Sequence, residues 1–178
     1  VLKGDELEKA RARESDPYPD PPISRRALVW KMDQPLPAGP PLKAWEFNGD
    51  TPEGWHPYQV APLVVRGGVL STTAAGEDPQ LIVDHVGVPI EGLECVALRL
   101  KTAKGISTCQ LFWTTLAEPG MTAGKCFTFP LNPDGEWHQY QVSQKPEGAW
   151  SGTLKILRLD VGGAGDPIEL DWVRLYGE

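Results

Sequence analysis

The chain changes its hydrophobic pattern at about residue 42. From Leu42 onward, apolar runs of about five to eight residues alternate with clusters of Gly, Pro, Asn and Asp, which is typical of an all-β chain. No long stretch with the apolar period of a helix lies between these runs. The predicted strands are 43–47, 58–60, 63–65, 69–73, 80–84, 94–101, 107–114, 125–131, 137–142, 154–161 and 168–176.

Short turn signals join several of these strands. They are 66–68 (RGG), 132–135 (NPDG) and 162–165 (GGAG). Such close connections favour antiparallel pairing of the strands that they join. About ten strands of this kind predict an antiparallel β-sandwich of jelly-roll type rather than an open sheet.

The first 40 residues have a different character. Residues 5–14 (DELEKARARE) have high helix propensity, but Leu7 is the only large apolar side chain that this short helix could bury. Segments 15–22 and 35–41 are rich in proline, which lacks the amide donor and restricts the residue before it. These two segments are therefore predicted to be extended connectors.

A short apolar segment, 25–32 (RRALVWKM), lies between the connectors. It could add an edge strand or pack Trp30 on the domain. We expect a Pro-rich N-terminal arm or linker over 1–40 and a β-sandwich domain over 41–178.

Alternation along the strands sorts their side chains into a core face and an outer face. The predicted core residues of strands 94–101 and 154–161 are Val96, Leu98, Leu100, Leu157, Leu159 and Val161. Arg99 and Arg158 then lie on polar outer faces.

Strand 137–142 places Trp137, Gln139 and Gln141 together on a face that should meet water. A flat apolar ring beside amide donors and acceptors suits a pyranose, which offers C–H faces for stacking and hydroxyls for hydrogen bonds. The alternative is burial, because Trp in a strand is often a core residue.

Strand 107–114 gives two further candidates. Alternation separates Gln110 and Phe112 from Cys109, Leu111 and Trp113. Gln110 and Trp113 are candidate ligand contacts, and burial is again the alternative for the tryptophan.

The sequence contains seven tryptophans, and some of them sit beside turn residues. Trp55, followed closely by Tyr58, comes after a polar loop, and Trp150 lies in another loop. Aromatic side chains in loops have less core to fill, so these three residues are candidate ligand contacts. For Trp150, an anchor that plugs the end of the sandwich is the alternative.

Charge narrows the classes of partner. The net charge is −7, and all of it lies after Pro40, because residues 1–40 hold seven basic and seven acidic side chains. An acidic body repels phosphate backbones and anionic membrane surfaces. No run approaches the roughly 20 apolar residues of a membrane helix. We therefore expect neither nucleic-acid binding nor membrane insertion.

Cys95, Cys109 and Cys126 are too few and too widely spaced for a disulfide framework or a zinc cluster. They are expected to be buried thiols, since unpaired cysteine behaves as a small apolar residue. A bridge between Cys109 and Cys126 is the alternative.

Several short segments together resemble a known group of proteins. They are 45–47 (WEF), 54–55 (GW), 136–140 (EWHQY), 150–154 (WSGTL), 157–160 (LRLD) and 169–175 (ELDWVRL). In this order they resemble the galactose-binding-like β-sandwich modules of polysaccharide-active enzymes, with carbohydrate-binding module families 4, 9 and 22 as the nearest comparison. The resemblance covers about three-quarters of the chain and says nothing about residues 1–40.

The resemblance implies a non-catalytic module that holds a parent enzyme, in the same chain, on a polysaccharide or oligosaccharide. It also implies a secreted or cell-surface protein and a structural Ca²⁺, for which Glu46 and Asp171 are the matching residues. Asp171 alternates in phase with Val173 and Leu175, which would turn its carboxylate towards the core, where Ca²⁺ could compensate the charge. An ion pair with Arg174 or Lys43, or a hydrogen bond to the 67–68 turn, is the alternative.

Two other functions are weighed against a glycan-binding module. A carbohydrate-active enzyme would need paired carboxylates or a base opposite a metal, and the sequence offers no complete motif of either kind. A structural or docking β-sandwich of a multidomain secreted protein would bury its aromatic residues and contact a neighbouring domain, and the Pro-rich arm with Trp30 favours this reading.

Overall fold

The computed structural model describes residues 26–103, 105–146, 152–162 and 165–177. The predicted helix 5–14, the connector 15–22 and Trp150 lie outside these described residues.

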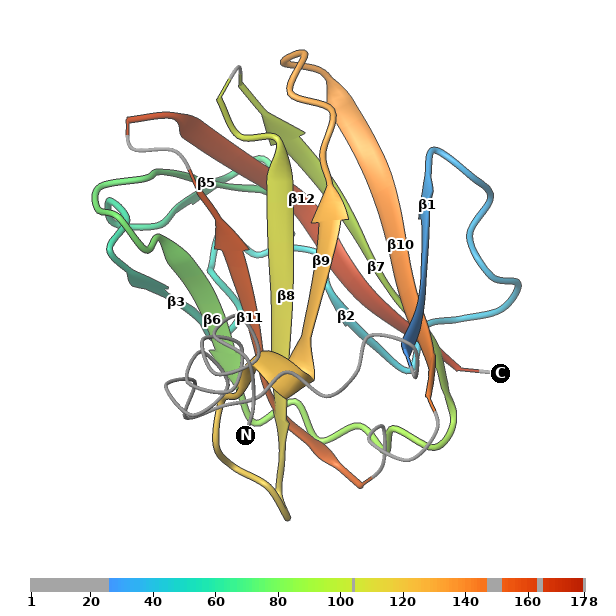
Figure 1. Cartoon of the computed structure of the whole chain (residues 1–178). Coiled ribbons are helices and arrows are strands. Elements are labelled where there is room, and N and C mark those ends of the chain that lie inside the picture. Colours follow the sequence, from blue (N-terminus) through green and yellow to red (C-terminus); the bar gives the residue numbers. More distant parts are fainter. Residues whose placement is uncertain (1–25, 104, 147–151, 163–164, 178) are drawn as a thin grey trace, which may run out of the picture.

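Two antiparallel sheets make up the described structure, and the smaller lies in front of the larger in Figure 1. The large sheet has the order β1 (Arg26–Met32), β10 (Trp137–Pro146), β7 (Leu93–Thr102), β12 (Pro167–Gly177), β5 (Val69–Thr73) and β4 (Val64–Arg66), and β2 (Lys43–Trp45) also pairs with β12. The small sheet has the order β3 (Trp55–Tyr58), β6 (Gln80–Asp84), β11 (Leu154–Val161), β8 (Thr108–Thr115) and β9 (Cys126–Pro130). The prediction of an all-β antiparallel sandwich is confirmed.

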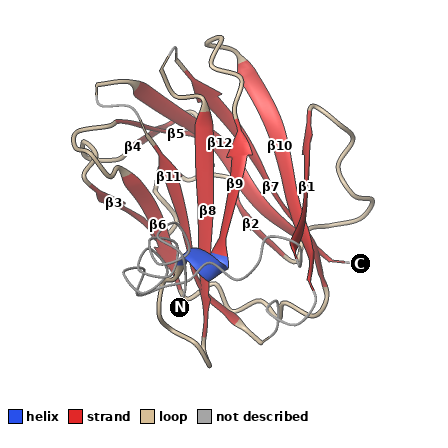
Figure 2. Cartoon of the chain, in the orientation of Figure 1, coloured by secondary structure: helices blue, strands red, loops and turns tan. Residues whose placement is uncertain are grey.

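Helix contributes almost nothing to the described residues. A single 3₁₀ turn, Ala123–Lys125, is drawn in blue at the start of β9 in Figure 2. No helix in this part of the chain has the length and apolar character of a membrane span. Strand β1 lies within the predicted arm and pairs with β10, so the sheet extends upstream of the boundary expected at residue 41.

The core lies between the two sheets, as the alternation predicts. Val96, Leu98 and Leu100 of β7 are fully buried, and so are the inward residues of β11. Aromatic pairs join the sheets at two places. The ring centroids of Phe129 in β9 and Tyr140 in β10 are 5.9 Å apart. Those of Trp45 and Trp55 are 5.7 Å apart, and these two rings meet edge to face. Such contacts add to the burial that holds the sheets together.

Strand β12 contains a β-bulge that changes which side chains face the core. Leu170 lies opposite Leu100 and Trp172 lies opposite Arg99, so Asp171 is the extra residue. The inward residues shift phase there, because Leu170 is buried before the bulge and Val173 after it. The expectation that Asp171 faces the core is wrong, since its carboxylate bonds to Arg99 on the outer face.

A segment between β1 and β2, residues 33–42, crosses part of the outer face of the large sheet, and we call it the strap. It is the light-blue loop that follows β1 at the right of Figure 1. Its Leu36 packs against a small apolar cluster on that face, formed by Cys95, Ala97, Trp172 and Tyr176. The strap therefore covers one part of the face and ends beside another.

The cysteines are arranged as buried or half-buried side chains. Cys109 lies opposite Phe129 and points to the core, whereas Cys126 lies opposite Phe112 and points to the outer face. Because they point to opposite faces of the sheet, Cys109 and Cys126 do not form a bridge with each other. Burial raises the pKa of Cys95 to about 11, so this thiol is unreactive at neutral pH.

Replacing a central core side chain tests the packing. Leu98→Ala removes a fully buried side chain of β7 and is expected to lower the free energy of unfolding by about 2 to 5 kcal/mol, measured by urea denaturation. Val64→Ala, on an exposed position of edge strand β4, is the control and should change it by about 0.5 kcal/mol or less. Equal effects of the two substitutions would contradict the described core.

Candidate functional site

Filled inner faces leave the outer faces of the two sheets as the places where a ligand can bind. Trp55 is 2% exposed and Trp113 is 0% exposed, and both lie in the core. The prediction that they contact a ligand is therefore wrong, because other core side chains cover both rings. Trp113 stacks on Phe127, with ring centroids 4.5 Å apart.

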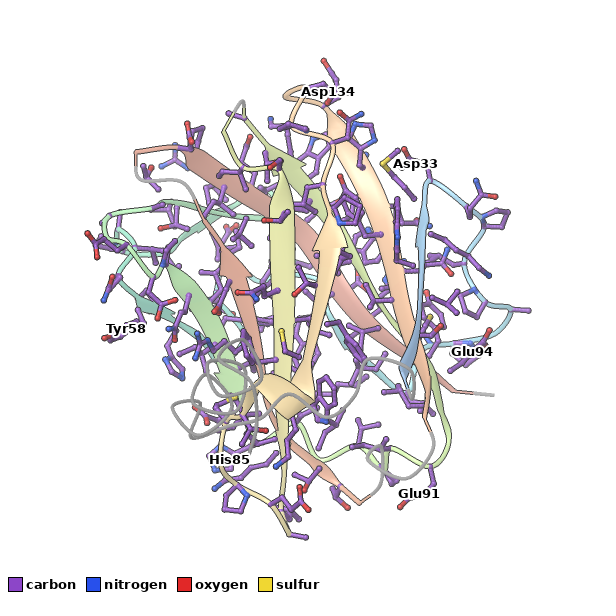
Figure 3. All side chains as sticks on the ribbon, in the orientation of Figure 1. Asp33, Tyr58, His85, Glu91, Glu94 and Asp134 are labelled. Carbon is purple, nitrogen blue, oxygen red and sulfur yellow. The ribbon has the colours of Figure 1, made fainter. Side chains whose placement is uncertain are left out.

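The outer face of the small sheet carries a row of polar side chains that crosses all five strands. Strand register aligns Tyr58, Gln80, Asp160, Gln110 and Thr128 in this row. Tyr58 is 50% exposed at the β3 edge, and Figure 3 shows it projecting from the left side of the molecule. We call this surface the small-sheet face.

Arg158 lies at the centre of the small-sheet face, one row away. Its guanidinium carbon is 4.7 Å from the ring centroid of Phe112, the half-buried aromatic residue of the next strand. Its Nε donates to Asp160 Oδ1 at 2.6 Å, and a second nitrogen donates to Asp160 Oδ2. Asp78 lies 3.6 Å from the same guanidinium. The cation is thus fixed by a bidentate carboxylate and an aromatic ring.

Burial makes this ion pair unusual for an outer sheet face. The side chains of Arg158 and Asp160 are only 19% and 11% exposed. Burial raises the pKa of Asp160 above its ordinary value, and the hydrogen bonds from Arg158 oppose that rise. A buried ion pair contributes little net stability compared with apolar packing.

Hydrogen bonds extend from this centre to the edges of the small-sheet face. Gln80 donates to Asp78 at 2.5 Å, and Gln110 donates to Thr128 at 3.4 Å. His56 Nε2 lies 2.8 Å from Asp84 Oδ2 in an exposed pair near the β3 edge. These contacts fix several donors and acceptors before any ligand arrives.

The outer face of the large sheet carries a second group of candidate residues. Trp137 is half-buried, and Arg99 and Lys101 of β7 approach its ring to 5.1 and 5.2 Å from the centroid. Arg99 donates to Asp171 at 2.5 Å, and Lys101 pairs with Glu169.

A groove of about 530 Å³ lies beside Trp137, between its ring and the strap. Its lining residues are Asp33, Gln34, Pro35, Leu36, Arg99, Trp137 and Gln139. The side-chain amide of Gln139 donates to the carbonyl of Gln34 at 2.6 Å, and that of Gln141 donates to the same carbonyl at 2.9 Å. Gln141 is buried, so the prediction of an exposed face is wrong at this residue: its amide holds the strap.

The two residues expected to bind calcium face different partners. Arg174 donates to both carboxylate oxygens of Glu46, at 2.7 and 2.9 Å, and Asp171 pairs with Arg99. As placed, they do not fit a shared calcium site. Among the described residues, no group of three or more His, Cys, Asp or Glu side chains could hold a metal ion. Calcium stays a prediction, which a comparison of melting temperatures with and without a chelator would test.

The start of the strap contacts β10 through Asp33, which bonds to His138 of that strand. His138 Nδ1 lies 2.7 Å from Asp33 Oδ2, and its Nε2 lies 3.0 Å from Asp134 Oδ1. The bond to Asp33 raises the pKa of His138, burial opposes the rise, and Asp134 adds to it. Burial raises the pKa of Asp33, but the bonds from Gln139 N–H and His138 outweigh it and leave the pKa lower than usual. Figure 3 labels Asp33 and Asp134 at the same end of the molecule.

Comparison with solved structures identifies proteins that share this fold. A mutant of a family 29 carbohydrate-binding module has a TM-score of 0.50 and 12% identity over 85% of this chain and 94% of its own. The chain has the fold of these modules. An agarase matches with a TM-score of 0.53 and 12% identity over 78% of this chain and 24% of the agarase. An arabinose-bound α-L-arabinofuranosidase matches with a TM-score of 0.50 and 13% identity over 69% of this chain and 23% of the arabinofuranosidase.

No family model matches the sequence, and no curated protein matches it. The likeness to solved structures therefore concerns the fold, and the resemblance to a β-sandwich carbohydrate-binding module is confirmed at that level.

The candidate residues predicted from sequence divide between two faces. Tyr58, Gln110 and Arg158 lie on the small-sheet face, whereas Arg99, Trp137 and Gln139 lie on the large sheet. Trp150 lies outside the described residues. Sequence reasoning missed Gln80 and Asp78, because a short polar pair at a strand start has no recognisable signature. Alternation along the sequence places Asp160 with Arg158 and Phe112 with Gln110 on outer faces, although neither residue was selected as a candidate ligand contact.

The His138 contacts predict a pH-dependent stability. A raised pKa means that the contribution of His138 is complete below its ordinary value of 6.5 and is lost as the pH rises through the folded value. The lowered pKa values of Asp33 and Asp134 make their contribution complete above 3.8 and lost as the pH falls through the folded values. The contacts of His138 with Asp33 and Asp134 should therefore stabilise the folded chain most between pH 3.8 and pH 6.5.

The expected result is a fall in the melting temperature of the native chain relative to His138→Gln as the pH rises from about 5.5 to about 8.5. Gln keeps polarity but does not titrate. Thermal unfolding followed by circular dichroism measures both chains. Parallel profiles for the two chains would show that the Asp33 and Asp134 contacts do not couple to folding.

Proposed function

We propose that the chain is a non-catalytic carbohydrate-binding module and that the small-sheet face binds its glycan. The observation that carries this proposal is the polar row across five strands, centred on the half-buried Arg158–Asp160 pair and flanked by Phe112 and Tyr58. A sugar needs fixed hydrogen-bond partners together with aromatic surface, and this face provides both.

The dimensions of the row favour an extended ligand. Neighbouring strands are about 4.8 Å apart, so five strands give a row roughly 19 Å wide from Tyr58 to Thr128. A row of this length suits an oligosaccharide segment better than a single sugar. The ligand would lie across the strands, with its hydroxyls on the exposed Gln110 and Thr128 and beside the half-buried Asp160.

The fold comparison supports this class of function. One solved neighbour is a carbohydrate-binding module, and two others are polysaccharide- or arabinoside-active enzymes of which this chain matches about a quarter. A role in holding a polysaccharide-active enzyme on its substrate follows as part of the proposal. A secreted or cell-surface location belongs to the proposal too.

Affinity electrophoresis of the chain in gels containing β-glucan, xylan, mannan or pectin tests the function. We expect retardation by at least one polymer. Tyr58→Ala should weaken binding by roughly three- to tenfold, as for the loss of an aromatic contact worth about 0.5 to 1.5 kcal/mol. Gln110→Ala should weaken it to a similar extent through a lost hydrogen bond.

Leu116→Ala, at an exposed residue outside the row, is the matched control and should bind as the native chain does. Absence of retardation by every polymer would reject the function. Retardation that neither Tyr58→Ala nor Gln110→Ala weakens would reject the small-sheet face as its site.

A docking role is the second candidate, and one observation favours it. Edge strand β1 leaves Val29 and Trp30 about 40% exposed, which suits contact with another domain or chain. A concentration-dependent oligomer in size-exclusion chromatography that Trp30→Ala abolishes would support this role.

A further inference from the structure

We propose that the groove beside Trp137 is a second glycan-binding site, on the opposite side of the sandwich from the small-sheet face, and that it takes an uncharged oligosaccharide. The inference rests on the proposed function, because it assigns another site to the same class of ligand. Its residues come from β7, β10 and the strap, and none of them belongs to the small-sheet face.

Trp172 and Trp137, on the outer face of the large sheet, differ in how far the strap covers their rings. Trp172 is 7% exposed, packs with Leu36 of the strap and lies 4.2 Å from the guanidinium carbon of Arg174. Trp137 lines the open groove instead. The strap thus closes over one ring and forms a wall beside the other, which leaves an aromatic surface facing a cavity.

The groove is wide open to solvent, and its size and lining suit a small ligand. Its volume of about 530 Å³ lies within the range of about 300 to 1,000 Å³ that is usual for small-molecule sites. Arg99 and Lys101 both approach the ring from the β7 side, and the strap carbonyls fix the amide of Gln139. A sugar ring entering between Trp137 and the strap meets one aromatic surface and several oriented polar groups.

Charge on this face selects an uncharged ligand. Arg99 is paired with Asp171 and Lys101 with Glu169, so two cations face two anions. An acidic sugar would have to displace a carboxylate of the protein from its partner, whereas a neutral sugar can bond to the outer oxygens and nitrogens of intact pairs. Asp33 is held by His138 and by Gln139 N–H. The cations beside the groove are therefore already paired, and the Asp33 carboxylate in its lining disfavours an acidic ligand.

Two sites on opposite faces have a functional consequence. One module could hold two strands of a polysaccharide, or two parts of one strand, and so bind a polymer more tightly than either site alone. Figure 3 shows Tyr58 and Asp33, which mark the two sites, on opposite sides of the view.

Amide chemical-shift changes in nitrogen-15 NMR spectra of the whole chain test the inference. The probes are cellohexaose, xylohexaose and mannohexaose, with a galacturonic acid hexamer as the charged comparison. With at least one neutral probe we expect two separate groups of shifting amides, one in 108–112 and 156–160 and the other in 33–36, 99–101 and 137–139. Trp137→Ala should abolish the second group and leave the first with its native affinity. Tyr58→Ala should weaken binding at the first group by roughly three- to tenfold and leave the second group unchanged.

Trp137→Phe guards against loss of folding, because it keeps an aromatic ring and should retain the second group of shifts at reduced affinity. Trp30→Ala is the matched control, since it removes another half-exposed tryptophan outside both sites and should leave both groups unchanged. Melting curves of every variant show whether each is folded.

The possible results separate the inference from the proposed function. Shifts in the first group alone overturn the second site and leave the proposed function standing. Shifts in the second group alone support the second site and reject the small-sheet face. A response of the second group only to the acidic hexamer, or to protein concentration without sugar, overturns the uncharged glycan as its ligand. No shift with any probe overturns both proposals.

Discussion

Burial of large apolar side chains between two sheets is the constraint on which the other features of this molecule depend. Leu98, Trp113 and Tyr140 are fully buried there, and cross-sheet aromatic contacts join β9 to β10 and β2 to β3. Protein interiors of this kind are close-packed, so a ligand is confined to the outside of the sheets. Strict alternation then decides which polar side chains each outer face presents.

The bulge at Asp171 interrupts that alternation in the middle of the central strand β12. It turns Asp171 outward, where it meets Arg99, and lets Val173 return to the core. Without the extra residue, the chain could bury either Leu170 or Val173, but not both. The bulge therefore satisfies the core and supplies the outer face with a carboxylate that neutralises one of its cations.

Alternation explains how much of this could be predicted from sequence. It identified the core residues of β7, the inward Leu157, Leu159 and Val161 of β11 and the outward position of Arg158, because the strands alternate regularly over these residues. It failed at Asp171, since a bulge leaves no signature in one sequence, and at Trp55, which was assigned to a loop although its ring fills the core against Trp45. The strap could not be foreseen either, because the bonds that Gln139 and Gln141 make to Gln34 join residues about 105 positions apart.

The two outer faces fix their polar side chains in different ways. On the small-sheet face, Arg158 and Asp160 are fixed by burial and by each other, and the polar row runs to both edge strands, so nothing in the described register closes its ends. On the large sheet, the strap walls one side of the Trp137 ring, and its position depends on His138 and Asp33. An open row suits the interior of a polymer, whereas a walled groove suits a shorter segment. The difference follows from one segment of chain, because the strap lies across the large sheet only.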